Sequence, residues 1–444
     1  MKLAVLGSRP VRAPAGLALL LLLWAPAARA QVTEASSTTL FRIQPVWLGG
    51  DSRTTYSATE FVNLSMRSID VPGVQDLRLQ LSAWATGGLV SSGPDGILIG
   101  DVQLLTLQGS FFDRHLGVTL GRQLVTGGAA QALQLDGVNA TVAIAAGFGF
   151  NAYAGAPTPS PLATGPGIYA YVGAPSVNRG VVPIGDFAFG GRAFWRPSFG
   201  SEVGVSFNEV LDSGNLARQN LGLDLHYAIL SNLGVSASGI FSLAEMQVAD
   251  AEVSLSWQVL PTVELSVKGQ YSLPELSLPL TSIFTVFAYP ERTAVGGGVF
   301  WQALPRLSLY ADYQQLWVDG GSGNEADLRA TYKINRNSTV GLSDRLLLVP
   351  VNGYNDVRAW FLQSLNGAFR LSADLDWIWL ENPINQVRNS IIGTASLNWL
   401  IGNGWSAMLS GSGGTTTLYS TVFTATARVA YDFSASPSEK GTRR

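Results

Sequence analysis

The chain has 444 residues, of which 47% are hydrophobic, 10% aromatic and only 13% charged, with a formal net charge of −3 and no cysteine. The acidic balance argues against nucleic acid as the main partner, because phosphate contacts need a basic surface. The absence of cysteine excludes disulfides and thiolate metal sites, and the charged fraction is about half of that in ordinary soluble domains.

Residues 1–30 have the three parts of a secretory signal peptide. Three cationic residues precede the apolar run 17–24, and Ala28-Arg29-Ala30 provides a small-residue cleavage site. The run is shorter than the roughly 18–20 residues of a membrane helix, so we expect cleavage rather than anchoring. Cleavage before Gln31 removes Lys2, Arg9, Arg12 and Arg29, which leaves 24 basic and 31 acidic residues and a net charge of −7.

From about Thr38 to Phe433, apolar and polar residues alternate with the period of a β-strand. In 371–380, for example, Leu375 and Trp377 alternate with Asp374 and Asp376. The same alternation recurs in 77–85, 221–227, 251–259, 263–271, 307–314 and 327–333. Segments of about 9–12 residues are long enough for a tilted strand to cross a bilayer, whereas soluble strands average about five or six.

Connections of two kinds alternate along the chain. Short turns rich in Pro, Gly and Asn occur at 70–73, 260–261, 304–306, 335–337, 366–367 and 403–404. Longer connections lie between them, at 87–97, 125–136, 155–186, 272–292, 318–325, 348–355, 380–387 and 414–420. This asymmetry is typical of outer-membrane barrels with short periplasmic turns and long external loops.

These patterns predict an all-β fold, because no apolar run after residue 30 is long enough for a membrane helix. We expect one transmembrane antiparallel up-and-down β-barrel of about 22 strands, within a range of 18–22, formed by residues 31–433. Residues 434–444 would form a polar C-terminal tail.

Tryptophans fall near the ends of the expected strands, where amphipathic rings would lie at the headgroup level. They are Trp47, Trp84, Trp195, Trp257, Trp301, Trp317, Trp377, Trp379, Trp399 and Trp405.

The last expected strand, TVFTATARVAYDF at 421–433, places Tyr431 two residues before Phe433 on one apolar face. It resembles the C-terminal strand signal of bacterial outer-membrane barrels, which implies the barrel-assembly machinery as a partner of this strand. The signal is internal here, because the polar tail follows Phe433.

A second stretch, LGVTLGRQLVTGG at 116–128 with LQLDGVNATV at 133–142, resembles the Gly-Arg-Gln strand of porin-like and alginate-export-type barrels. In those barrels the arginine and glutamine lie near the outer end of the strand, before a loop.

Catalytic candidates are few. The only hydrolase-like arrangement would combine His226 with Asp224 or Asp312, and a lumen-lining histidine without catalytic role is the stronger interpretation. The other histidine, His115, falls in an expected turn. We therefore predict no enzymatic activity, no metal site and no cofactor.

Strand parity predicts which charged side chains face a watery lumen, since a cation facing lipid costs about 2–4 kcal/mol at the bilayer midplane. The expected lumen-facing residues are Arg78, Asp224, His226, Glu252, Glu264, Lys268, Asp312, Asp327, Arg329, Lys333, Asp374, Asp376 and Arg428. Acids and bases are mixed, which predicts at most weak ion selectivity. The connections 155–186 and 272–292 are candidates to fold inward and narrow the lumen.

The sequence therefore predicts a porin-like channel in the cell outer membrane for the passive passage of polar solutes. Export of a polymer such as a polysaccharide is an alternative, as the likeness to alginate-export-type barrels implies. A third is a sealed structural or adhesion barrel that anchors envelope machinery. Outer-membrane lipid is the expected surrounding, and the sequence indicates no particular oligomeric state.

Overall fold

The computed structural model describes residues 30–48, 51–90, 97–158, 187–198, 200–212, 214–273, 291–318, 320–350, 352–417 and 420–435. The expected signal peptide, and most of the candidate plug segments 155–186 and 272–292, lie outside these ranges. No helix in the described ranges has the length and apolar character needed to cross a membrane.

Twenty-two strands account for nearly all of the described chain. They are β1 (Ala30–Leu48), β2 (Asp51–Val71), β3 (Val74–Val90), β4 (Ile97–Phe111), β5 (Leu116–Thr126), β6 (Ala132–Ala143), β7 (Phe148–Pro157), β8 (Phe187–Ser198), β9 (Ser201–Asp212), β10 (Asn215–Leu230), β11 (Leu233–Ser242), β12 (Gln247–Leu260), β13 (Val263–Ser272), β14 (Arg292–Leu304), β15 (Leu307–Val318), β16 (Gly321–Asn335), β17 (Ser338–Leu348), β18 (Tyr354–Ser364), β19 (Phe369–Ile384), β20 (Val387–Gly402), β21 (Trp405–Thr415) and β22 (Val422–Ala435). Two 3₁₀ turns, η2 (Gly128–Ala130) and η3 (Ala145–Gly147), complete the described elements.

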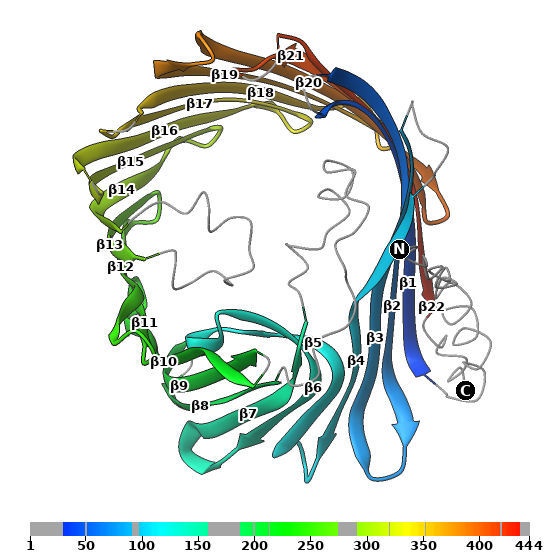
Figure 1. Cartoon of the computed structure of the whole chain (residues 1–444), viewed down its shortest axis with the longest axis vertical. Coiled ribbons are helices and arrows are strands. Elements are labelled where there is room, and N and C mark those ends of the chain that lie inside the picture. The colour runs from blue at the N-terminus through cyan, green and yellow to red at the C-terminus, as the bar shows by residue number, and fades with distance from the viewer. Residues whose placement is uncertain are drawn as a thin grey trace, which may run out of the picture.

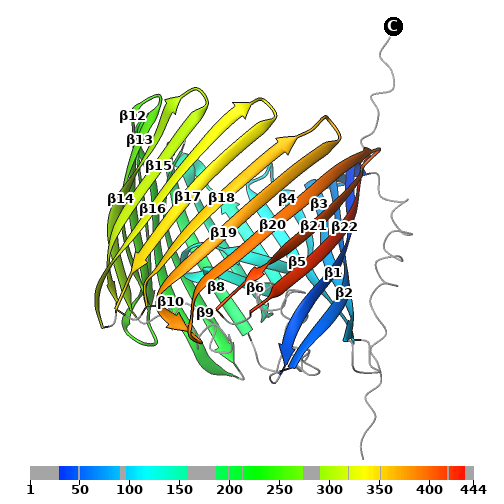
Figure 2. The ribbon, with the colours of Figure 1, turned by 90° about the horizontal axis from the view of Figure 1, so that it is seen from above.

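Each strand pairs antiparallel with its neighbour in sequence, and β1 also pairs with β22, so the sheet closes on itself. The closing register runs from Thr33 opposite Ala435 to Ile43 opposite Ala425. Figure 1 shows the resulting ring and Figure 2 its obliquely tilted strands. The predicted all-β, 22-stranded up-and-down barrel is confirmed.

The connections differ in length from those expected at one end of the barrel. The six predicted short turns lie at the end where β1 begins and β22 finishes. At the other end, the supposed loops 318–325 and 380–387 reduce to residues 319–320 and 385–386, because β15, β16, β19 and β20 extend beyond the predicted boundaries. At these strand ends both faces of the sheet contact water, and backbone pairing continues there without an apolar face. The alternation of apolar and polar residues therefore stops before the strand does.

The outer face of the barrel is apolar. Leu375, Trp377 and Trp379 are about half exposed and point away from the side of Asp374 and Asp376. Near the short-turn end, Phe148 stacks on Trp195 and Phe369 on Trp399, with ring centroids 5.7 Å apart in each pair, and Trp405 lies tilted against Tyr431 with centroids 4.7 Å apart. Phe187, Phe189 and Phe207 gather near the opposite end. The outer face therefore carries two aromatic girdles separated by an apolar band.

Trp84 is an exception to the predicted girdle. It is only 3% exposed and pairs across the sheet with Phe61 and Asp101, on the inner face. Its strand parity is that of Arg78 and Gln80, so the alternation outweighs the general preference of tryptophan for the membrane interface.

Some carboxylates face outward, against the expectation that folding places charges inside; Glu60, Glu209 and Asp344 are among them. Glu60 pairs with Thr39 and accepts hydrogen bonds of 2.5 Å from both Ser37 and Thr39. Asp344 pairs with the outward-facing Leu328 and Val357, and its buried Oδ1 has no hydrogen-bond partner within the described ranges. Glu60 is therefore compensated by hydroxyl groups, whereas Asp344 is not.

We expect Asp344→Leu to raise the free energy of unfolding of the barrel by about 1 kcal/mol, because a carboxylate is removed from an apolar surface. Urea unfolding in lipid vesicles, followed by tryptophan fluorescence, measures the change. Asp327→Leu on β16, which faces the opposite side of the sheet, is the control and should give no such gain. An unchanged or lower stability of Asp344→Leu would contradict the outward placement.

Candidate functional site

The candidate site is the inner face of the barrel. Five successive Cα partners on the neighbouring strands β19 to β15 define this face. They are Asp376, Arg358, Ser343, Arg329 and Tyr310. Continuing around the ring, the same register places every residue predicted to face the lumen on this side: Arg78, Asp224, His226, Glu252, Glu264, Lys268, Asp312, Asp327, Arg329, Lys333, Asp374, Asp376 and Arg428.

Oppositely charged side chains pair along β13–β19. Lys268 Nζ lies 3.0 Å from Asp312 Oδ1, and Arg358 Nη2 lies 2.7 Å from Asp374 Oδ2. Glu325 joins two arginines, with Arg292 Nη2 at 3.0 Å and Arg345 Nε at 2.9 Å. These pairs neutralise most of the charge on this side of the wall and hold its side chains in place.

The neighbouring lumen-facing carboxylates Asp374 and Asp376 have different surroundings. Asp374 is neutralised by Arg358, whereas Asp376 lies against the carboxyl group of Asp356 on β18. On β16, Arg329 Nη2 lies 3.7 Å from Asp327 Oδ2, and the Arg329 guanidinium lies 6.0 Å from the ring centroid of Tyr310. Asp356 and Arg358 escaped prediction because the alternation in 354–364 is interrupted by Trp360 and Leu362 on the inner side.

A second ion cluster lies on β8–β10. Arg192 donates to both Glu202 and Asp224, and Arg196 Nε lies 2.5 Å from Glu202. Arg192 of β8 is the Cα partner of Asn151 of β7, and both lie on the inner face. The cluster fixes three strands to one another on the lumen side.

Unpaired charges of opposite sign lie on opposite walls. Arg428, Arg42 and Arg78, on β22, β1 and β3, face inward and make no ion pair with any residue in the described ranges, and the Nε of each lacks a hydrogen bond. Asp250, Glu252 and Glu264 on β12 and β13 face inward and likewise have no cationic partner there. Figure 1 places these two groups of strands across the ring from each other.

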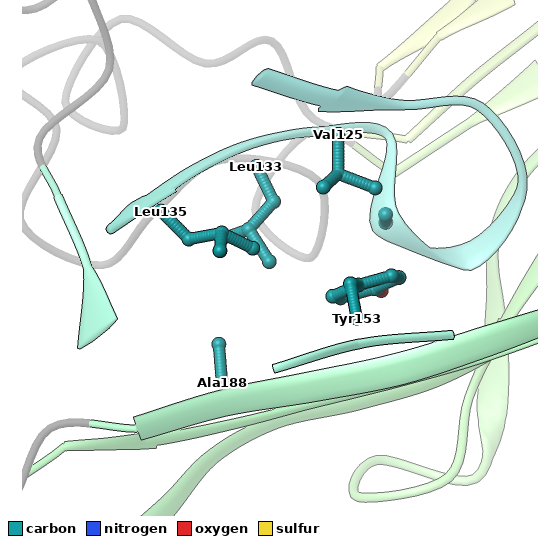
Figure 3. Packing of buried hydrophobic residues seen from close by; sticks show 6 residues of the cluster. Val125, Leu133, Leu135, Tyr153 and Ala188 are labelled. Carbon is teal, nitrogen blue, oxygen red and sulfur yellow. The ribbon is translucent and has the colours of Figure 1, made fainter. Parts of the chain in front are cut away.

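The hairpin formed by β5, η2 and β6 bends into the lumen rather than continuing the wall. Val125, Ala130, Leu133 and Leu135 on the hairpin pack against Tyr153 and Ala188 of β7 and β8 (Figure 3). At its tip the backbone N–H of Ala129 donates to Ser206 Oγ on β9 at 2.8 Å. The hairpin therefore narrows the described part of the lumen, a role that the sequence assigned to 155–186 and 272–292.

The wall beneath the hairpin is polar. Asn208 and Asn220 pair across β9 and β10 and have no exposed surface, and Tyr153 donates to Asn208 Oδ1 at 2.7 Å. Asn208 Nδ2, both amide atoms of Asn220 and Arg218 Nε have no hydrogen-bond partner within the described ranges. Each unmet buried polar group costs about 1–3 kcal/mol, so the closed arrangement is stabilised by its apolar contacts and opposed by these groups.

His226 is not arranged as a catalytic base. Its Nδ1 lies 2.8 Å from Ser236 Oγ, but Asp224 is bound by Arg192 and Asp312 by Lys268. Neither carboxylate predicted to orient the imidazole is available to do so. No group of three His, Asp or Glu side chains suited to a metal ion was found among the residues that the structure describes.

No family model matches the sequence, and no curated protein matches it. Solved structures with similar folds include the translocation pore of the P pilus usher PapC, with a TM-score of 0.49 and 7% identity over 90% of this chain and 99% of that chain. Others are OccAB4 of Acinetobacter baumannii (TM-score 0.40, 10% identity, 92% and 99% covered) and OccK5 (OpdH) of Pseudomonas aeruginosa (TM-score 0.42, 11% identity, 91% and 98% covered). These likenesses concern the barrel fold alone.

Proposed function

We propose that the protein is a channel of the cell outer membrane through which polar solutes pass passively. One observation carries this proposal: a closed ring of 22 strands has an apolar outer face between aromatic girdles and a charged inner face. A soluble barrel would bury its apolar face inside, whereas a bilayer-spanning pore needs this inverted arrangement. The expected export signal 1–30 and the terminal strand 421–433, as a contact for barrel assembly, agree with this location.

The unpaired charges suggest how solutes would be oriented. Arg42 and Arg428 on one wall and Glu252 and Glu264 on the other would set up a field across the lumen. Because the two walls oppose each other in sign, the net preference for anions or cations would be weak, while dipolar solutes would be aligned.

Reversal potentials in a salt gradient test this arrangement. Arg42→Gln with Arg428→Gln should shift the selectivity of the channel toward cations, and Glu252→Gln with Glu264→Gln should shift it toward anions by a comparable amount. Lys333→Gln, close to the short-turn end of β16, is a single-charge comparison. Equal reversal potentials for both double variants would show that these walls do not border the conducting path.

Uptake of solutes by proteoliposomes tests passage itself. Swelling in sugars of increasing size should show entry of small sugars and exclusion above a size limit, without any energy source. If barrels of verified folding admitted no sugar, passive passage would be wrong and the sealed structural barrel would take its place.

Polymer export is a second candidate, because aromatic rings also face the lumen. Phe61, Tyr310 and Trp360 lie on the inner face, where rings could contact the flat faces of successive sugars. Oligosaccharides of increasing length should then block the ionic current with residence times that grow with length. Blocking independent of length would remove this candidate.

A further inference from the structure

The bend of the β5–β6 hairpin follows a line of glycines. Gly121, Gly137 and Gly155 are successive Cα partners across β5, β6 and β7. A Cβ at Gly121, where φ is +105°, would lie 2.1 Å from the carbonyl oxygen of Leu105, and one at Gly137 would lie 2.1 Å from that of Ala154. A Cβ at Gly155 would lie 2.4 Å from the carbonyl oxygen of Asp136. The sheet therefore bends along a line where no side chain has room, and only glycine fits there.

Among the described residues, the same bend leaves part of β4 paired with β3 on one side but without a strand partner on the side of β5. Pairing between β4 and β5 stops at Leu105 opposite Arg122, although β4 continues to Ile97 and β5 to Thr126. Residues 97–104 of β4 consequently form no ladder with β5. Backbone N–H and C=O groups without partners are unfavourable within a membrane. Residues 123–126 of β5 lie beyond the last pair and could extend the ladder along β4.

Side chains partly compensate for the missing pairing. Arg122 Nη1 donates to the carbonyl oxygen of Val102 at 2.7 Å, and Gln134 Nε2 donates to that of Gln103 at 2.6 Å. Arg122 is itself held by Asp136, at 2.7 Å, and by Asp101, at 3.1 Å. Arg122 thus acts as a positioning residue at the bend, since it binds both β4 and the hairpin.

Asn208 Nδ2, both amide atoms of Asn220 and Arg218 Nε are buried and have no hydrogen-bond partner among the described residues. Asn208 lies on β9 between Ser206, which bonds η2, and Val210, which packs against the apolar cluster. Lifting the hairpin would let water reach these atoms, at the expense of the apolar contacts of Val125, Leu133 and Leu135.

We propose that the β5–β6 hairpin is a hinged gate, which rests on the proposed channel function. In one state the hairpin lies in the lumen, bonded to Ser206, and residues 97–104 of β4 form no hydrogen-bonded pairs with β5. In the other state the hairpin has rotated at the glycine line into the plane of the barrel wall. There β5 extends its pairing with β4, and the lumen is wider. Arg122 stays at the hinge in both states, so the hairpin moves without leaving the wall.

A cysteine pair tests the gate in the channel itself. The natural chain has no cysteine, and the Ala129 nitrogen lies 2.8 Å from Ser206 Oγ, so Ala129→Cys with Ser206→Cys should cross-link only the inward state. The control pair is Ser372→Cys with Ser396→Cys, whose hydroxyls lie 2.5 Å apart between two adjacent wall strands. We expect the reduced hairpin pair to switch between two conductance levels and the oxidised pair to lose the higher one. The control pair should behave alike in both conditions.

Identical traces from the oxidised and reduced hairpin pair, with the cross-link verified by mass, would overturn the gate. Spin labels at Thr126→Cys on the hairpin and Ser410→Cys on β21 give a readout that needs no conduction. Two distance populations in vesicles are expected, and a single population would overturn the gate even in a conducting channel. Absence of current from every variant would instead refute the proposed function, and the spin-label distances would still decide the gate.

Discussion

Leu135→Asp should increase the conductance of the channel, because it releases the β5–β6 hairpin from the wall. Leu135 has no exposed surface and packs in the cluster with Leu133, Tyr153 and Ala188. Loss of such a leucine costs about 2–5 kcal/mol of packing, and a buried carboxylate without a partner adds to this cost. Single-channel recording measures the conductance, and the barrel itself should remain intact because Leu135 is the last residue of β6 that pairs with β7, so the rest of that ladder is unchanged.

Leu124→Asp is the matched control for this experiment. Leu124 lies on the same hairpin but is 47% exposed, outside the cluster that packs on the wall. The same charge there should leave the conductance near that of the natural chain. Equal conductance in Leu135→Asp and Leu124→Asp would mean that the hairpin does not obstruct the conducting path.

Gly121→Val should destabilise the barrel strongly at the junction of β4 and β5. The positive φ of Gly121 is strained by about 1–3 kcal/mol for a residue with a side chain. The added Cβ would also lie 2.1 Å from the carbonyl oxygen of Leu105, which is backbone and cannot rotate away. We expect a loss of folded, heat-modifiable barrel on gels and a lower urea midpoint for what folds.

Gly117→Ala on the same strand controls for the general effect of replacing a strand glycine. The nearest atom to a Cβ there is the carbonyl oxygen of Thr141 at 4.0 Å, an ordinary contact. This variant should fold as the natural chain does. If Gly121→Val folded and unfolded like Gly117→Ala, the hinge geometry at Gly121 would be wrong.

The alternation in the sequence was sufficient to predict the barrel because its two solvents differ. Lipid outside and water inside force opposite side-chain types onto the two faces of each strand, and a period of two records this directly. Asp374, Asp376 and Trp377 illustrate it: their parity alone predicted which of them face inward. The strand number followed because turns rich in Pro, Gly and Asn punctuate the pattern.

The same period could not reveal the hairpin. Leu133 and Leu135 alternate with polar neighbours just as lipid-facing residues do, yet they pack on the inner wall of β7 and β8. They continue the inner parity of Gly137 and Asn139 on β6, but parity does not show that the strand leaves the wall. A glycine in a strand does not say in which direction the strand bends. The Gly-Arg-Gln stretch marked the right position, before the hairpin, without indicating the inward turn.

Charge pairing also depended on more than parity. Arg358 on β18 and Asp374 on β19 meet through a diagonal in the register. Glu325 on β16 meets Arg345 on the neighbouring β17 and Arg292 on β14, two strands away. Parity assigns side chains to a face but leaves their height relative to neighbouring strands undetermined. The unpaired arginines of β22, β1 and β3 therefore emerged only from the three-dimensional register.

Single-channel conductance of the refolded chain in a planar bilayer tests the central claim most directly. A 22-stranded barrel with a charged inner face predicts stable, ohmic current steps in a simple salt solution. Barrels that are heat-modifiable on gels, and therefore folded, but that give no current steps would contradict the account of this protein as an outer-membrane channel.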